Sequence, residues 1–169
     1  TVFDQLRRRL GQYRDDVQRY LEAQHTAGVN IFDRAYKKVP GSDPVKFNTA
    51  YDRALEAMLQ KMSDELLDDI PALRFALLVD ENGYAPTHNR KFAQPPTGDR
   101  AKDLLTSRDK RIFDDDTAIN AARSQEPFLL QTYLRDTGEL LNDASMPVFV
   151  NGRHWGAVRV GIDPESLSK

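Results

Sequence analysis

The sequence predicts an α+β domain in which a long N-terminal helix and a second helix pack on a five-stranded antiparallel sheet. Apolar residues recur every three or four positions up to residue 70, and short apolar runs separated by turn residues follow from residue 71. A chain of 169 residues can bury a real core. We expect residues 1–70 to form a helical segment and residues 71–165 to form the sheet-containing domain, as one structural unit.

Composition narrows the function classes. The formal net charge is -2, 30% of the residues are charged and the mean hydropathy is -0.62, which is typical of a well-solvated protein and not of a nucleic-acid binder. The sequence contains no cysteine, so disulfides, thiolate metal sites and cysteine nucleophiles are excluded. It also shows no membrane span and no signal peptide. Those two observations fit a cytosolic protein and a domain cut from between two membrane spans equally well.

The first 39 residues are predicted to form one long helix. Its apolar stripe consists of Phe3, Leu6, Leu10, Tyr13, Val17 and Tyr20. Alternating steps of three and four place these side chains on one face, as in a coiled coil or a helical hairpin. Gly11 and Gly28 each cost such a helix about 1 kcal/mol. We therefore expect the helix to depend on packing against a partner.

A second helix is expected after the break at residues 40–44. Asp43 is suited to the N-cap and Pro44 to the first helical position. The apolar stripe that follows is Phe47, Tyr51, Leu55, Met58, Met62 and Leu66. Pro71 ends the helix. The sequence leaves open whether this helix pairs with the first one or crosses the sheet.

Five strands are predicted after Pro71, at residues 73–80, 84–88, 128–135, 140–150 and 154–162. Asn82-Gly83 is a strong hairpin turn, and Pro86 marks the returning strand as distorted or at an edge. Residues 136–139 and Asn151-Gly152 supply the later turns. Residues 89–110 form a long polar loop with one helical turn near residues 100–105, and a loop of this length is usually functional or disordered.

Several of these segments together resemble one known family. The segments are residues 84–99, Lys110–Asp115, residues 121–123, 127–133, 135–139 and 151–156, and they agree with it in order and spacing. The chain is similar here to the periplasmic Cache (PAS-like) sensor domain, of the single-Cache type, of bacterial methyl-accepting chemotaxis proteins. Ala118 is a departure, because glycine is expected at that position.

The resemblance implies a ligand-binding sensor domain and not an enzyme. It implies a periplasmic domain of an inner-membrane protein, membrane-anchored in the full-length chain and paired into a homodimer through the N-terminal helix. Such a domain binds a small molecule, needs no cofactor and binds no nucleic acid. Only the resemblance favours a chemoreceptor over a sensor kinase or a cyclase, because the output module is not contained in this sequence.

Strand alternation gives a separate argument for a binding site. Gln131 and Tyr133 share one face of their strand, while Phe128, Leu130 and Leu134 share the other and are expected to face the long helix. In the next strand Asp143 and Ser145 share a face. A polar face of this kind needs partners when it is buried, and a small polar ligand would supply them. A solvated face or an internal hydrogen-bond network is an equally open interpretation.

Arg111 is the candidate anchor for a carboxylate ligand, because a guanidinium offers a planar pair of donors. The other candidates near it are Tyr84, His88, Lys110, Phe113, Gln131, Tyr133 and Asp143. A structural ion pair between Arg111 and Asp114 or Asp115 is the competing interpretation. Asp143 favours a ligand that also carries a donor, so an amino acid, a hydroxy acid or a small amine stays open.

Other chemistries have less support. His88 and His154 are too far apart in sequence to indicate a metal site, and Asp114–Asp116 lacks the calcium-loop pattern. An enzyme that uses His88, Asp143 or nearby tyrosines would lack any recognised nucleophile or phosphate motif. A dimerisation or partner-protein module without a small-molecule ligand is the remaining alternative, and polar substitutions at Leu10, Tyr13 or Val17 should harm it most.

Overall fold

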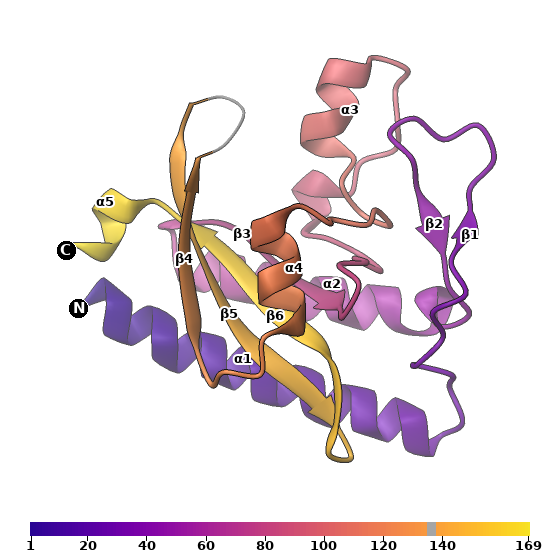
Figure 1. Ribbon diagram of the computed structural model, residues 1–169, viewed down its shortest axis with the longest axis horizontal. Coiled ribbons are helices and arrows are strands. Elements are labelled where there is room, and N and C mark those ends of the chain that lie inside the picture. The colour runs from indigo at the N-terminus through magenta and orange to yellow at the C-terminus, as the bar shows by residue number, and fades with distance from the viewer. Residues whose placement is uncertain (135–137) are drawn as a thin grey trace.

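A computed structural model describes residues 1–134 and 138–169 of the chain (Figure 1). A four-stranded antiparallel sheet in the order β3-β6-β5-β4 is its centre. The helices are α1 (Val2–Thr26), α2 (Asp52–Asp69), α3 (Arg100–Thr106), α4 (Asp116–Arg123) and α5 (Pro164–Leu167). The strands are β1 (Lys37–Lys38), β2 (Phe47–Asn48), β3 (Leu73–Asp80), β4 (Leu129–Leu134), β5 (Leu140–Val150) and β6 (Arg153–Ile162), and η1 (Arg90–Phe92) is a 3₁₀ turn. The α+β class is confirmed.

Helix α1 is shorter than predicted, and Gly28 explains where it ends. Gly28 has a φ of +93°, which glycine adopts without steric cost. Its N–H donates to the His25 carbonyl, and the N–H of Val29 donates to the Gln24 carbonyl. These two bonds form the Schellman motif that ends helices. The prediction of a single helix over 39 residues was therefore wrong. Of its apolar stripe, Leu6, Leu10, Tyr13 and Val17 are buried, and Phe3 and Tyr20 are partly buried.

Helix α2 also begins later than predicted. Residues 39–46 turn back, so that β1 and β2 pair antiparallel, and α2 starts at Asp52 and not at Pro44. The side chain of Asp52 accepts the backbone N–H of Thr49 at 3.0 Å, which fixes this start. Met58 is 40% exposed and does not belong to the buried stripe. Helix α2 packs against both β3 and α1.

The sheet has four strands where five were expected, because residues 84–88 form no strand. Tyr84 makes only an isolated bridge with Ile112. Pro86 has no N–H to give to a ladder. Further along, the Asn89 side chain accepts the N–H of Ala76 at 2.8 Å, so a side chain covers the β3 edge where a strand was predicted. The predicted turn at residues 136–139 lies partly outside the described residues.

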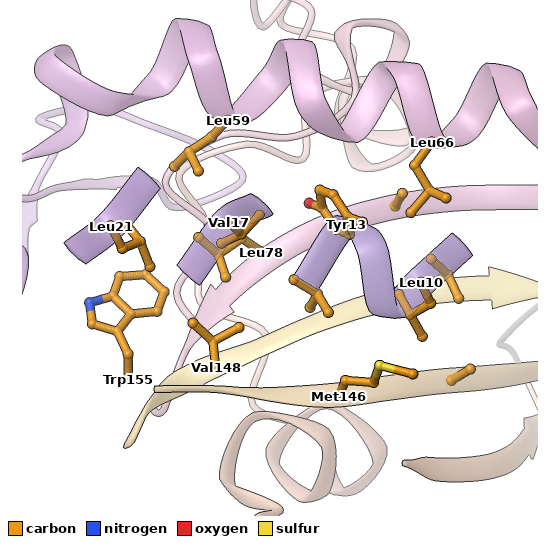
Figure 2. Packing of buried hydrophobic residues seen from close by; sticks show 14 of the residues in the cluster. Leu10, Tyr13, Val17, Leu21, Leu59, Leu66, Leu78, Met146, Val148 and Trp155 are labelled. Carbon is orange, nitrogen blue, oxygen red and sulfur yellow. The ribbon is translucent and has the colours of Figure 1, made fainter. Parts of the chain in front are cut away.

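Helix α1 lies between α2 and one face of the sheet (Figure 2). Its buried side chains Leu10, Tyr13 and Val17 point into this layer. Trp155 closes one end of the core and donates from Nε1 to the Ile31 carbonyl at 2.7 Å. The other face of the sheet carries α4. Both chain termini lie at the same end of the molecule (Figure 1).

The prediction that Phe128, Leu130 and Leu134 all pack on the long helix was correct for only one of them. The Phe128 ring lies 5.8 Å from the Phe3 ring of α1, measured between centroids. Leu130 and Leu134 are 43% and 65% exposed. The reason is that α1 packs on β5, whereas β4 is the edge strand beyond β5.

Candidate functional site

The face of the sheet that points away from α1 brings polar residues of several strands into two rows. Directly paired residues of antiparallel strands lie on the same face. One row, defined by the strand register, contains Phe75, Gly161, Asp143 and Gln131. The neighbouring row contains Leu77, Arg159, Ser145 and Leu129. The predicted alternation of Asp143 and Ser145 against Ala144 and Met146 is confirmed.

A buried ion pair lies at the centre of this face. Arg159 donates to Asp143 Oδ2 from Nε at 3.1 Å and from Nη2 at 2.7 Å. The side chain of Asp143 is 0% exposed and that of Arg159 is 8% exposed. Asp143 Oδ1 is also buried and has no hydrogen-bond partner within the described part of the chain. Burial raises the pKa of Asp143, and Arg159 opposes that shift.

Residues 107–113, here called the strap, cross in front of this face. Lys110 N–H donates to the Ala85 carbonyl at 2.7 Å, and Ala85 N–H donates to the Arg111 carbonyl at 3.0 Å. Phe113 N–H donates to the Gly83 carbonyl at 2.9 Å. Gly83 must be glycine, because its φ is +83° and a Cβ would lie 2.0 Å from the Phe113 carbonyl oxygen. These bonds hold the strap against residues 83–85.

The strap places two guanidinium groups near one aromatic ring. Arg108 and Arg111 lie 5.1 and 5.0 Å from the centroid of the Phe113 ring. Arg111 Nη1 is buried, and no described residue accepts a hydrogen bond from it. Within residues 1–134 and 138–169, Arg111 forms no ion pair with Asp114 or Asp115, because Asp115 caps α4 instead. Burial lowers the pKa of Arg111, and the charge of Arg100 adds to that shift.

His88 lies close to three arginines, Arg108, Arg111 and Arg159. It is 3% exposed, and its Nδ1 accepts the N–H of Asn89 at 2.7 Å. Burial, followed by the charges of Arg108, Arg159 and Arg111, lowers the pKa of His88 to about 3. The imidazole is therefore neutral at neutral pH. Three guanidinium groups act on this one position, while Asp143 is the only carboxylate among the described residues that is buried at the centre of the face. The local field therefore favours an anion.

The candidate residues from the sequence divide into two groups in space. Six of them belong to the sheet face and its cover: His88, Arg111, Phe113, Gln131, Tyr133 and Asp143. Gln131 is already bonded to α4, since its Nε2 donates to the Thr117 carbonyl at 3.0 Å. The half-buried Tyr133 acts electrostatically on Arg159.

Tyr84 and Lys110 are not brought to this face. The hydroxyl of Tyr84 bonds Asp52 Oδ2 at 2.8 Å, at the start of α2. Lys110 Nζ lies 2.7 Å from Glu56 Oε2, on the same helix. Lys110 therefore contacts α2, while the neighbouring Arg111 lies over the Phe113 ring.

Arg159 and Phe75 were missed by the sequence analysis. Arg159 interrupts the otherwise apolar run of β6, and it shares the parity of Ala157 and Gly161. A charged residue in the middle of a buried strand is the signal that could have identified it. Phe75 gave no comparable signal. Its ring covers Gly161, where a Cβ would lie 2.1 Å from the ring atom Cε2.

The described residues contain no group of three or more His, Cys, Asp and Glu side chains arranged to hold a metal ion. Among the helices that the structure describes, none combines the length and the apolar composition needed to cross a membrane.

No family model and no curated protein matches this chain. Its structure is similar to the sensor domain of DcuS from E. coli, with 15% identity, a TM-score of 0.44 and coverage of 65% of this chain and 72% of that one.

Two other similar structures are longer than this chain. The extracellular domain of vpHK1S-Z8, described as a histidine kinase, has 16% identity, a TM-score of 0.48 and coverage of 98% and 57%. The ligand-binding domain of the Campylobacter jejuni chemoreceptor Tlp3, solved with 4-methylisoleucine, has 13% identity, a TM-score of 0.44 and coverage of 99% and 62%. The chain thus spans less than two thirds of both. These three structures are described as a sensor domain, an extracellular domain of a histidine kinase and a ligand-binding domain of a chemoreceptor.

Proposed function

We propose that this chain is the extracytoplasmic ligand-binding sensor domain of a membrane-anchored chemoreceptor, and that it binds a small carboxylate. The observation that carries the proposal is the Arg111 guanidinium, which has a buried Nη1 and no acceptor in the described residues. A buried donor without a partner costs free energy. A ligand carboxylate would supply the acceptor, and the charges of Arg108 and Arg159 would add to its attraction.

The ligand that fits best also carries a hydrogen-bond donor. Asp143 Oδ1 is also buried, and no described residue donates a hydrogen bond to it. A carboxylate with a nearby ammonium or hydroxyl group would satisfy Arg111 and Asp143 together. Amino acids and hydroxy acids are therefore the favoured classes. Purely cationic amines fit less well, because the guanidinium groups would repel them.

Signalling is proposed to pass from the sheet to α1. Helix α1 packs on β5, and the opposite face of β5 carries Asp143 and Ser145. Residues 1–70 and 71–165 would then act as one unit, in a periplasmic domain of an inner-membrane protein. A ligand transmits a signal only if it binds two arrangements of these elements with different affinity. The apolar stripe of α1 is used inside the domain, so a homodimer through α1 would use its exposed polar side.

A thermal-shift screen of the purified domain tests the proposal with small carboxylates, amino acids, amines and purines. We expect a carboxylate-bearing compound to raise Tm in the wild-type protein and to lose this effect in Arg111→Ala. The matched control is Arg53→Ala, because Arg53 is an exposed arginine on α2. A hit that persists in Arg111→Ala would contradict the anchor. The absence of any shift would favour a partner-protein module instead.

A further inference from the structure

Lys110 has an unusual backbone conformation at the centre of the strap. Its φ is +61°, in the left-handed region that long side chains rarely adopt. Among described residues other than glycine, only Asn151 shares a positive φ, and Asn151 occupies a hairpin turn that tolerates it. A lysine held in this conformation needs compensating interactions from its surroundings.

Several contacts hold Lys110 in place, and they come from three parts of the chain. The ammonium Nζ donates to Glu56 Oε2 at 2.7 Å and to the Pro86 carbonyl at 2.9 Å, and it lies 3.8 Å from Asp52 Oδ2. The Lys110 carbonyl accepts the N–H of Phe47 at 2.8 Å. The side chain is 21% exposed, so these contacts are largely shielded from water.

The position of Arg111 depends on this residue. Arg111 directly follows Lys110, and its own carbonyl accepts the N–H of Ala85. Its guanidinium lies over the Phe113 ring, and among the described residues it has no ion pair of its own that would fix it. A rotation of the backbone at Lys110 would therefore turn the Arg111 side chain away from the sheet face.

We propose that Lys110 is a positioning residue for ligand binding: its ammonium, held by Glu56 of α2, locks the left-handed turn that presents Arg111 to the sheet face. This proposal rests on the proposed function of the Arg111 site and names a residue that acts on that site without touching the ligand. It also makes α2 a structural part of the binding site, through the carboxylates of Glu56 and Asp52.

The test uses three variants and one control. Lys110→Met keeps the aliphatic stem and removes the ammonium, Glu56→Ala removes its partner, and Lys110→Arg restores a cation. The control is Lys61→Met, because Lys61 is also a lysine paired with a glutamate, Glu65, on α2, but its side chain is 67% exposed.

Two readouts separate this proposal from the proposed function. Without ligand, phenylglyoxal modification of Arg111 is followed by mass spectrometry, with the buried Arg159 as the internal measure of folding. We expect Arg111 to react at least fivefold faster in Lys110→Met and Glu56→Ala, and at the wild-type rate in Lys110→Arg and Lys61→Met. With the carboxylate found in the thermal screen, we expect Kd to rise about tenfold in the first two variants only.

The possible results lead to different conclusions. Unchanged Arg111 reactivity in both Lys110→Met and Glu56→Ala would overturn the positioning role, whatever the ligand. If no carboxylate binds the wild-type protein, the proposed function fails, and the modification rates alone decide whether Lys110 positions Arg111. If Lys110→Met also exposes Arg159, that variant has unfolded, and Glu56→Ala, which leaves the strap sequence intact, decides the question.

Discussion

Arg159 donates from two nitrogens to a single oxygen of Asp143, Oδ2, and the other oxygen is buried with no donor among the described residues. A side-on pair would use both oxygens and satisfy the carboxylate. Half-satisfied polar groups in a low-dielectric interior do not favour stability. The geometry is better explained by a carboxylate whose second oxygen serves another partner, which is the role proposed here for a ligand donor.

Removal of one member of this pair should cost more than removal of both. Asp143→Leu leaves the Arg159 charge buried and uncompensated, so we expect a loss of about 3–5 kcal/mol in the free energy of unfolding. The double variant Asp143→Leu/Arg159→Leu should recover most of that loss, because no charge then stays buried. Urea denaturation of the two single variants and the double variant measures the coupling. Additive losses would show that the two side chains do not act as a pair.

Gly161 should be intolerant of alanine because of the Phe75 ring above it. The new Cβ would lie 2.1 Å from Cε2, so the ring must move. We expect Gly161→Ala to lower the free energy of unfolding by about 1–3 kcal/mol, the usual cost of overpacking. Adding Phe75→Ala should remove this penalty, so that Gly161→Ala costs little in that background. An equal cost in both backgrounds, measured in urea, would locate the strain elsewhere.

The sequence was sufficient for features that depend on local patterns. Strand alternation correctly separated Asp143 from Met146, and the 3-4 spacing correctly identified the buried stripe of α1. The same spacing does not specify what covers the stripe. It fits a coiled coil and a helical hairpin equally well, and α2 and the sheet cover the stripe within one chain (Figure 2).

The remaining features depend on contacts that are distant in sequence. Gly28 was counted as a cost inside a helix, whereas it ends the helix through a Schellman motif. Lys110 and Arg111 were assigned together because they are adjacent, and only the position of Glu56, 54 residues away, separates their roles. Arg159 was missed because its partner Asp143 lies on another strand.

The burial of the α1 stripe predicts how this helix responds to mutation. Leu10 is fully buried, so Leu10→Ala should lower the free energy of unfolding by about 2–5 kcal/mol, through lost burial and the cavity left behind. Arg8→Ala on the exposed side should change it by less than about 0.5 kcal/mol. Denaturation with urea and sedimentation velocity measure stability and association. A stable Leu10→Ala protein with altered association would instead assign the stripe to a dimer interface.

His88 should make the fold sensitive to mild acid. Its folded pKa of about 3 lies below the unfolded value of 6.5, so below pH 6.5 only the unfolded chain takes up the proton. The contribution of the neutral imidazole to the free energy of unfolding is fully present above pH 7. We expect it to fall by about 1.4 kcal/mol per pH unit between pH 6 and pH 4. Asp143, with its raised pKa, opposes this trend, so the informative quantity is a difference between two proteins.

His88→Asn supplies that difference, because its amide oxygen can still accept the Asn89 N–H but cannot be protonated in this range. The free energy of unfolding, measured in urea from pH 7.5 to pH 4, should decline more steeply in the wild type than in the variant. A saturating carboxylate should reduce the difference, since an anion beside Arg108, Arg111 and Arg159 offsets the charges that oppose protonation. Parallel pH profiles for the two proteins would contradict a buried neutral histidine at the centre of the cationic site.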